Sequence, residues 1–261
     1  MPGDYCSAAD VAKYLSMQGD TKLRAAVAAG ASVLPVEDAS LFLVGQTLAF
    51  DFYSSRREVI EIQATDLTPG ANTVTTTALV AFAHPVGVPL KEVSLIRDLI
   101  SRISRLWDRY CLAPLGFDRE SVTEVLNGLV GSTGELVVLA GKPTVAAVTS
   151  LSYRTVFAPS SSVTPSRCWI SGRQVKVPDA GLIGWRGAPI EVTIAYSGGY
   201  SPLPDDIIHG VTVLTARAWK SKDAGWSDAV GSADLGQLTY SKLMPREIKA
   251  IADNYKLWAV A

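Results

Sequence analysis

One strongly amphipathic segment, residues 94–111, separates two long β-rich stretches of this sequence. Its apolar residues recur at steps of three and four, the spacing of one face of an α-helix. They are Ile96, Leu99, Ile100, Ile103, Leu106, Trp107 and Tyr110. Ser94 is a suitable N-cap, and Pro114 prevents the helix from continuing. We therefore expect a helix here, with β-structure on both sides of it in the sequence.

The first β-rich stretch, residues 20–93, consists of short runs of Val, Thr, Leu and Phe broken by glycine and proline turns. We expect strands at 32–36, 47–52, 58–64 and 73–77, because such closely spaced strands are typical of a small β-barrel or sandwich. The secondary structure of residues 23–29 is ambiguous. Their alanines favour a helix, whereas Gly30 favours a strand that pairs back through a turn.

The second β-rich stretch covers residues 121–200, with strands expected at 121–126, 135–139, 145–156, 168–177 and 190–196. Helices are expected after Ser7, from Pro204 to about residue 221, and from Pro245. We interpret the fold as α+β. A helical core with a β-rich region spans 1–19 and 94–223, and residues 20–93 form an inserted, barrel-like β-module. Residues 224–261 form a flexible arm that ends in a short helix.

Bulk properties place the chain among globular proteins. Hydrophobic residues make up 48% and charged residues 19%, and the formal net charge is −1, so bulk charge does not indicate tight binding to nucleic acid. Three widely spaced cysteines predict free thiols in a reducing cytoplasm. We expect neither a signal peptide nor a membrane span.

The sequence carries no recognised catalytic motif. The two histidines, His84 and His209, have no partner at metal-ligand spacing, so we expect no metal site. Asp205 and Asp206 could act as paired carboxylates, but two acidic residues at a helix N-terminus need no further function. We expect no catalytic residue and no cofactor, although a site built from scattered residues stays open.

The residues at 190–207 resemble a known family. The segment Ile-Glu-Val-Thr-Ile-Ala-Tyr-Ser-Gly-Gly-Tyr at 190–200 is followed by Pro204 and two aspartates that open a helix. This pattern resembles the head-tail connector (adaptor, head-completion) proteins of long-tailed phages and prophages. A Gly/Ser-rich arm with Tyr240, a last helix at Pro245 and the opening helix at 7–15 are similar too. The module at 20–93 departs from the family, because many connectors run almost directly from the first helix to the second.

The resemblance implies a structural virion protein and not an enzyme. Its helices would pack around a channel, as a helical connector core. The implied partners are further copies in a homo-oligomeric ring, typically of twelve subunits, the portal protein on one side and a stopper or tail protein on the other. Double-stranded DNA would pass transiently through the ring during ejection, without a membrane. The implied location is the head-tail junction of the virion, after assembly in the host cytoplasm.

Two groups of residues are the candidates for these contacts. The arm would dock on the portal or a neighbouring subunit through apolar and aromatic anchors, because ordering a flexible segment must be offset by such contacts. These anchors are Tyr240, Ile248, Ile251, Tyr255 and Trp258. Alternatively, the last helix packs on its own domain. Arg102, Arg105 and Arg109 share one side of the 94–111 helix and would face the channel or a neighbouring subunit, or form a solvated face.

Two other function classes remain. A tail-associated β-module that binds glycans or another ligand would use exposed tryptophans, for which Trp169, Trp185 and Trp226 are the candidates. A hydrolase built from scattered acidic residues is the third.

Overall fold

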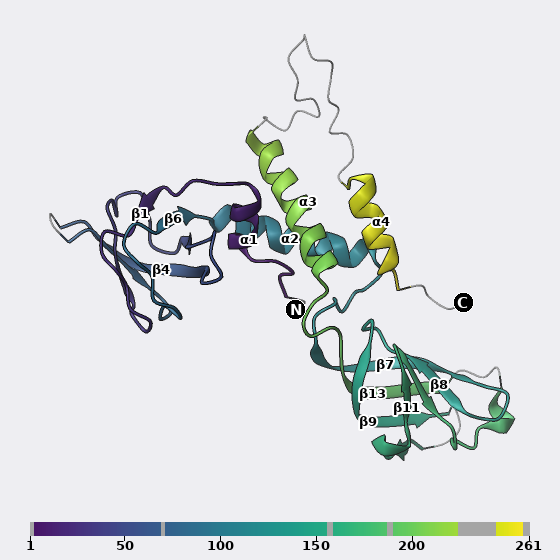
Figure 1. The fold of residues 1–261 in the computed structure, drawn as a ribbon. Coiled ribbons are helices and arrows are strands. Elements are labelled where there is room, and N and C mark those ends of the chain that lie inside the picture. Colours follow the sequence, from purple (N-terminus) through teal and green to yellow (C-terminus); the bar gives the residue numbers. More distant parts are fainter. Residues whose placement is uncertain (1–2, 69–70, 156–158, 187–189, 224–243, 258–261) are drawn as a thin grey trace, which may run out of the picture. The chain divides into compact units, whose positions relative to one another are not determined.

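The structure is a computed structural model that describes residues 3–68, 71–155, 159–186, 190–223 and 244–257 (Figure 1). The chain divides into two compact units. The six-strand unit contains Asp4–Ser104 and Ile208–Ile248, and the seven-strand unit contains Met1–Gly3, Arg105–Ile207 and Lys249–Ala261. Three helices cross this division in the sequence, and each unit is described by itself below.

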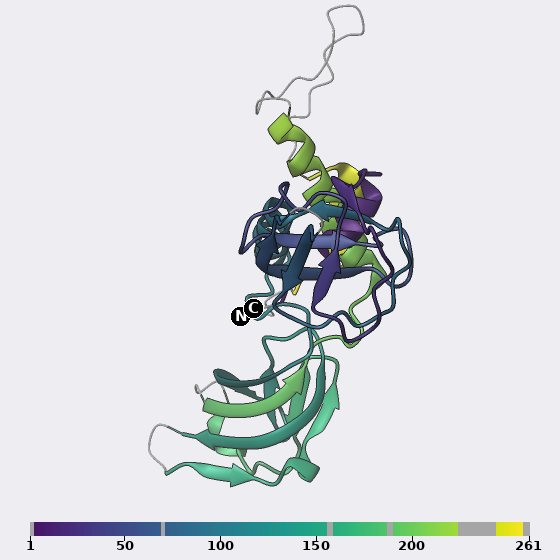
Figure 2. The same cartoon turned by 90° about the vertical axis from the view of Figure 1, so that its left-hand side faces the viewer.

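The six-strand unit is built on one antiparallel sheet with the strand order β1-β6-β3-β4-β5-β2. The strands are β1 (Thr21–Lys22), β2 (Val33–Pro35), β3 (Thr47–Phe50), β4 (Glu58–Asp66), β5 (Thr73–Thr76) and β6 (Pro89–Glu92). The two outer strands meet, because the Arg24 amide donates to the Pro35 carbonyl over 2.9 Å and the Glu37 amide donates to the Lys22 carbonyl over 3.0 Å. The sheet thus curls on itself (Figure 2) around a buried core. This core includes Leu23, Leu34, Leu48, Phe50, Ile62 and Leu90.

The strands expected at 32–36, 47–52, 58–64 and 73–77 are present as β2 to β5. Residues 23–29, for which helix and strand were both possible, form extended chain. Val27 forms a bridge with His84, and no residue of the segment is helical. Pairing with neighbouring strands overrides the helix preference of the alanines.

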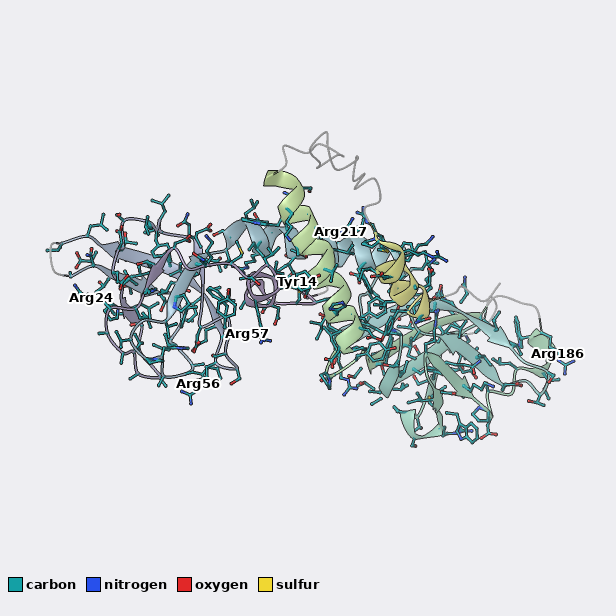
Figure 3. All side chains as sticks on the ribbon, turned by 45° about the horizontal axis from the view of Figure 1, so that its top comes forward. Tyr14, Arg24, Arg56, Arg57, Arg186 and Arg217 are labelled. Carbon is teal, nitrogen blue, oxygen red and sulfur yellow. The ribbon has the colours of Figure 1, made fainter. Side chains whose placement is uncertain are left out.

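Helix α1 (Ala8–Tyr14) begins after Ser7, as the sequence predicts, with a capping box. The Ser7 hydroxyl accepts the Asp10 amide over 3.1 Å, and the Asp10 carboxylate accepts the Ser7 amide over 3.1 Å. Within the same unit, Arg57 of the β3–β4 loop pairs with Asp10 over 2.6 Å (Figure 3). The Tyr53 hydroxyl donates to the Met17 carbonyl over 2.6 Å, so this loop holds both ends of α1.

Helix α2 (Ser94–Tyr110) is the amphipathic helix that the sequence predicts. Ser94 is its first residue, and the Ser94 hydroxyl accepts the Thr47 amide over 2.9 Å, which ties the start of the helix to β3. The helix ends before Leu112, whose φ of 57° is left-handed. Helix α3 (Asp205–Asp223) begins with two exposed aspartates at its positive end, and α4 (Arg246–Asn254) follows the predicted start at Pro245.

The seven-strand unit contains a second antiparallel sheet, with the order β10-β9-β13-β7-β8-β12-β11. Its strands are β7 (Glu120–Val130), β8 (Leu136–Leu139), β9 (Val145–Arg154), β10 (Ser161–Val163), β11 (Trp169–Ser171), β12 (Gln174–Val177) and β13 (Ile190–Gly198). The Val145 amide donates to the Gly172 carbonyl over 2.8 Å, so the β11–β12 turn returns to the start of β9 and the sheet curls. The core inside it includes Leu136, Val138, Val175, Val192, Ile194 and Tyr196.

The predicted α+β fold with a helical connector core is wrong. Of the described residues, 34% lie in strands and 25% in helices, and the two curled sheets each enclose a core of their own. The physical reason lies in the 121–200 stretch, which the sequence analysis attached to a helical body. Its long strands β7, β9 and β13 pair along almost their full length and bury their own alternating side chains, so they need no helices to cover them.

Candidate functional site

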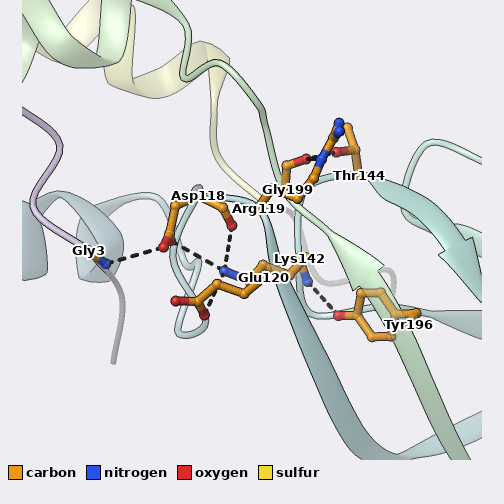
Figure 4. A network of polar contacts seen from close by, with 8 residues as sticks. All are labelled: Gly3, Asp118, Arg119, Glu120, Lys142, Thr144, Tyr196 and Gly199. Atoms are coloured by element: carbon orange, nitrogen blue, oxygen red, sulfur yellow. Dashed lines mark hydrogen bonds and ion pairs between the residues drawn. The ribbon is translucent and has the colours of Figure 1, made fainter. Parts of the chain in front are cut away.

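The most connected polar cluster lies where the chain enters and leaves the curled sheet of the seven-strand unit. The chain enters through Asp118 at the start of β7 and leaves through Tyr200 after β13, and these two residues form a parallel bridge. The Tyr200 amide also donates to the Phe117 carbonyl over 2.7 Å. We call the cluster of Asp118, Glu120, Lys142, Tyr196 and Gly199 the entry–exit clamp (Figure 4).

Lys142 is the centre of the clamp. Its side chain is 0% exposed, although lysine is among the residues that are least often buried. The Lys142 Nζ donates to the Asp118 carbonyl over 2.8 Å and lies 3.4 Å from the Asp118 carboxylate and 3.5 Å from the Glu120 carboxylate. An ammonium group has three donors, and here each faces an oxygen of the entering chain. The lysine therefore binds the β8–β9 corner to the entry segment.

Tyr196 and Glu124 extend the same network into the sheet. The Tyr196 hydroxyl donates to the Glu124 carboxylate over 2.6 Å and accepts the Lys142 amide over 3.1 Å. Glu124 also accepts the Gly141 amide over 3.0 Å. Burial and the hydrogen bond to Glu124 raise the pKa of Tyr196, so the hydroxyl stays a donor throughout the physiological range.

The backbone conformation at Gly199 accounts for one glycine of the segment 190–200, whose pattern resembles the connector family. Its φ is +100°, a conformation that side-chain-bearing residues rarely adopt. A Cβ on Gly199 would also collide with the Asp118 carbonyl oxygen, the same atom that accepts the Lys142 ammonium. The glycine thus lets the exit segment pass directly beside the entry segment.

A second polar cluster lies in the six-strand unit around His84, whose side chain is fully buried. The His84 Nδ1 is 3.1 Å from Asp51 and the Nε2 is 2.9 Å from Glu58. Glu58 also accepts the amides of Ala81 and Phe82, each over 2.8 Å. Each ring nitrogen thus faces one carboxylate oxygen. The histidine holds the loop before β6 against β4.

The clusters around Lys142 and His84 each hold segments of the chain together through hydrogen bonds. Within the described ranges, no group of three His, Cys, Asp or Glu side chains is placed to hold a metal ion. His209, the other histidine, is exposed at α3 and makes an edge-on contact with Tyr14 at 6.5 Å between ring centroids (Figure 3 labels Tyr14).

The candidate arginines Arg102, Arg105 and Arg109 are all exposed on α2. At steps of three and four residues they share one side of the helix. None of the three forms an ion pair with another residue in the part of the chain that the structure describes.

The end of α4 makes several contacts within the seven-strand unit. The Tyr110 hydroxyl donates to Asp253 over 2.6 Å, and Lys256 pairs with Asp253 over 2.7 Å while lying 4.3 Å from the centre of the Tyr110 ring. The bonds from Lys256 and Tyr110 lower the pKa of Asp253. The Leu257 amide donates to the Cys111 carbonyl over 2.8 Å. These contacts dock the end of the helix beside the end of α2.

The predicted interface residues of the arm differ in how deeply they are buried. Ile248 is buried, and Ile251 is half-buried. Tyr255 is also half-buried and packs edge-on against Phe117 and Tyr200, at 6.0 and 6.4 Å between ring centroids. Tyr240 and Trp258 lie outside the described residues. Tyr255 therefore packs against other residues of its own chain, as the alternative for the last helix expects.

Sequence reasoning missed the entry–exit clamp. Lys142 lies in Gly141-Lys142-Pro143, a turn sequence that carries no recognised motif. One usable signal existed, since a lysine between two predicted buried strands needs carboxylate or carbonyl partners. Their position before β7, some twenty residues earlier, follows only from the strand pairing.

Comparisons with known proteins give limited similarity. No family model matches the chain, and no curated protein matches it. Among solved structures, the chain is similar to one from the neck of an empty GTA particle computed with C6 symmetry. The TM-score is 0.40 and the identity 13%, over 64% of this chain and 78% of that one. None of the described helices is long and apolar enough to cross a membrane.

Proposed function

We propose that this chain is a structural virion protein, a head-tail connector subunit that forms a ring beneath the portal and does not act as an enzyme. In this role it binds the portal on one side and a stopper or tail protein on the other, and double-stranded DNA passes through the ring.

The observation that carries the proposal is the segment from β13 to α3. The sequence pattern that resembles the connector family forms a strand, a left-handed glycine beside the entry segment, and a helix that opens with two aspartates. The pattern thus corresponds to consecutive elements of the chain, in which Gly199 and Tyr200 have defined contacts. The buried Lys142 and His84 also support a structural role, because their polar atoms are engaged in holding the chain together.

The exposed arginines of α2 support a role for this helix in the ring. Three guanidinium groups on one side of a helix suit transient contact with phosphates or pairing with carboxylates of a neighbouring subunit. If the face contacts moving DNA, replacing Arg102, Arg105 and Arg109 with glutamine leaves ring assembly intact and changes DNA retention or ejection. If the face contacts a neighbour, the same variant prevents ring formation.

The test is reconstitution with the portal protein of the phage or prophage that encodes this chain. We expect the mixture to give ring-shaped complexes in negative-stain images and the Trp258→Ala variant to dock more weakly. Trp258 is a cleaner probe than Tyr255, because Tyr255 already contacts Phe117 and Tyr200 inside the chain. The matched control is Phe82→Ala in the six-strand unit, an exposed aromatic that is not among the arm candidates. Absence of any complex with the portal would refute the connector role.

A glycan-binding β-module is the second candidate, because Trp169 is 75% exposed. Trp185, in contrast, packs against the core of the seven-strand unit, and Trp226 lies outside the described residues. Titration with host-surface oligosaccharides, followed by tryptophan fluorescence, separates the candidates. Saturable quenching that Trp169→Ala abolishes would support the glycan role.

A further inference from the structure

The two contacts of His84 depend on a fixed number of protons. The ring is fully buried, and its Nδ1 lies 3.1 Å from the Asp51 carboxylate while its Nε2 lies 2.9 Å from the Glu58 carboxylate. An ionised carboxylate only accepts hydrogen bonds, and a neutral imidazole has one donor and one acceptor. Both contacts are therefore hydrogen bonds only when the three groups share two N–H or O–H protons, whichever groups carry them.

The contact with Asp51 is the weaker of the two. Glu58 has other partners, because its carboxylate also accepts the amides of Ala81 and Phe82, each over 2.8 Å. The Asp51 carboxylate, in contrast, has only His84 as a polar partner among the described residues, and its side chain is 17% exposed, so water can replace the ring. When the cluster loses one proton, the contact that breaks is therefore the one with Asp51.

Asp51 is also the residue at which the chain turns away from β3. Its φ is +51°, in the left-handed region that side-chain-bearing residues enter at a cost, although aspartate enters it more readily than most. Its carbonyl accepts the Ser54 amide over 2.9 Å. The contact with His84 thus fixes the side chain of the residue where the β3–β4 loop begins.

The same loop is attached to helix α1 of the six-strand unit. The Tyr53 hydroxyl donates to the carbonyl of Met17, which follows the helix, and Arg57 pairs with Asp10 in its first turn. Both contacts are made by side chains of the loop that starts at Asp51. A loop that loosens at Asp51 therefore loosens the segment at Met17 as well.

We propose that the contact between His84 and Asp51 is a pH-dependent switch, which fixes the β3–β4 loop and the segment at Met17 at low pH and releases both as the pH rises. The sign follows from the proton count, because the contact needs the proton that the cluster loses first. Histidine is the side chain whose charge ordinarily changes between about pH 5 and 8, so the switch lies in a range that a protein meets. It is independent of the connector role.

The other groups around the ring leave this contact to His84 and Asp51. Of the ionisable side chains, Asp51 faces the ring from the end of β3 and Glu58 faces it from β4. The Arg56 guanidinium donates to the Ala83 carbonyl over 3.5 Å. The Phe50 ring, which carries no charge, packs edge-on against the imidazole at 4.8 Å between ring centroids.

Hydrogen exchange of the full chain, followed by NMR from about pH 5.5 to about pH 8.5, tests the switch. The reporters are the amides of Ser54, bonded to the Asp51 carbonyl, and Met17, bonded to the Ala12 carbonyl. Each rate is divided by the intrinsic rate at the same pH. We expect protection to fall about tenfold at Ser54 as the pH rises, the effect of one lost hydrogen bond, and less at Met17. The Ile62 amide in β4 is the internal reference and should keep its protection.

Two variants separate His84 from other causes. Asp51→Asn should make protection at Ser54 independent of pH, because an asparagine amide both donates and accepts and also tolerates the left-handed conformation. His209→Gln is the matched control, since His209 is the other histidine of the chain and contacts Tyr14 of α1. It should keep the wild-type pH dependence, and it leaves His84 as the only imidazole whose NMR signals titrate.

Three results would overturn the proposal. One is constant protection at Ser54 over this pH range in the wild type, and another is a pH dependence that survives in Asp51→Asn. The third is a His209→Gln chain in which the His84 signals and the protection at Ser54 change with different midpoints. This third comparison decides if circular dichroism shows that Asp51→Asn does not fold. None of these measurements involves the portal, so the switch and the connector role can fail separately.

Discussion

Replacing Lys142 with methionine should selectively destabilise the seven-strand unit. Methionine keeps most of the buried volume but removes the hydrogen bond to the Asp118 carbonyl and the contacts with two carboxylates. The lost hydrogen bond is worth about 1 kcal/mol. Water reaches both carboxylates, which are 23% and 38% exposed, so each lost contact is worth only about 0.5 kcal/mol, at the level of surface pairs. We expect the free energy of unfolding of this unit to fall by about 2 kcal/mol.

The assay must report on each unit separately, since a chain of two units need not unfold in one step. Hydrogen exchange of β7 and β13 peptides, read by mass spectrometry, gives the local opening free energy. A loss of about 2 kcal/mol corresponds to roughly thirtyfold faster exchange of the most protected amides of these strands. Peptides of β3 and β4 in the six-strand unit should keep their wild-type rates.

Lys176→Met is the matched control, because Lys176 lies in the same unit but is only half-buried and forms no ion pair within the described residues. We expect it to change stability by no more than about 0.5 kcal/mol. Unchanged exchange in Lys142→Met, or equal effects of the two substitutions, would refute the role assigned to the buried ammonium.

Three further predictions concern the other clusters. His84→Leu leaves Asp51 and Glu58 without their shared hydrogen-bond partner and should cost about 1–3 kcal/mol, seen as a lower melting temperature by circular dichroism; an unchanged melting temperature would refute the account of this cluster. Burial raises the pKa of the Cys6 and Cys111 thiols to about 12. A thiol reagent at pH 8 should therefore label half-buried Cys168 first and the other two only after unfolding; fast labelling of three thiols would contradict their burial. Because bonds from Lys256 and Tyr110 lower the pKa of Asp253, its contribution to stability is present above about pH 4 and is lost as the pH falls through the lowered pKa. Asp253→Asn should remove this pH dependence from exchange at α4, and a variant with the wild-type profile would argue against it.

The local elements of this fold could be predicted from the sequence, because their signals are local. The period of the apolar residues defines α2, and a capping box places the start of α1 at Ser7. Short β-prone runs between turns define β2 to β5. Each of these features depends on residues within a few positions of one another.

The arrangement of the strands could not be predicted in the same way. The pairing of β13 with both β7 and β9 brings residues some forty to eighty positions apart into register, and no local pattern specifies such partners. The clamp at Lys142 depends on this pairing and was missed for that reason. The helical core was overestimated because helices have the stronger periodic signal, whereas most strands here are short.

The central claim is that this chain forms a ring at the junction of head and tail in a phage particle. A cryo-EM reconstruction of that junction, from particles of the phage or prophage that encodes the chain, tests it most directly. We expect density for copies of the seven-stranded sheet arranged around an axial channel. A junction fully accounted for by other proteins, with this chain absent from the purified particles, would contradict the claim.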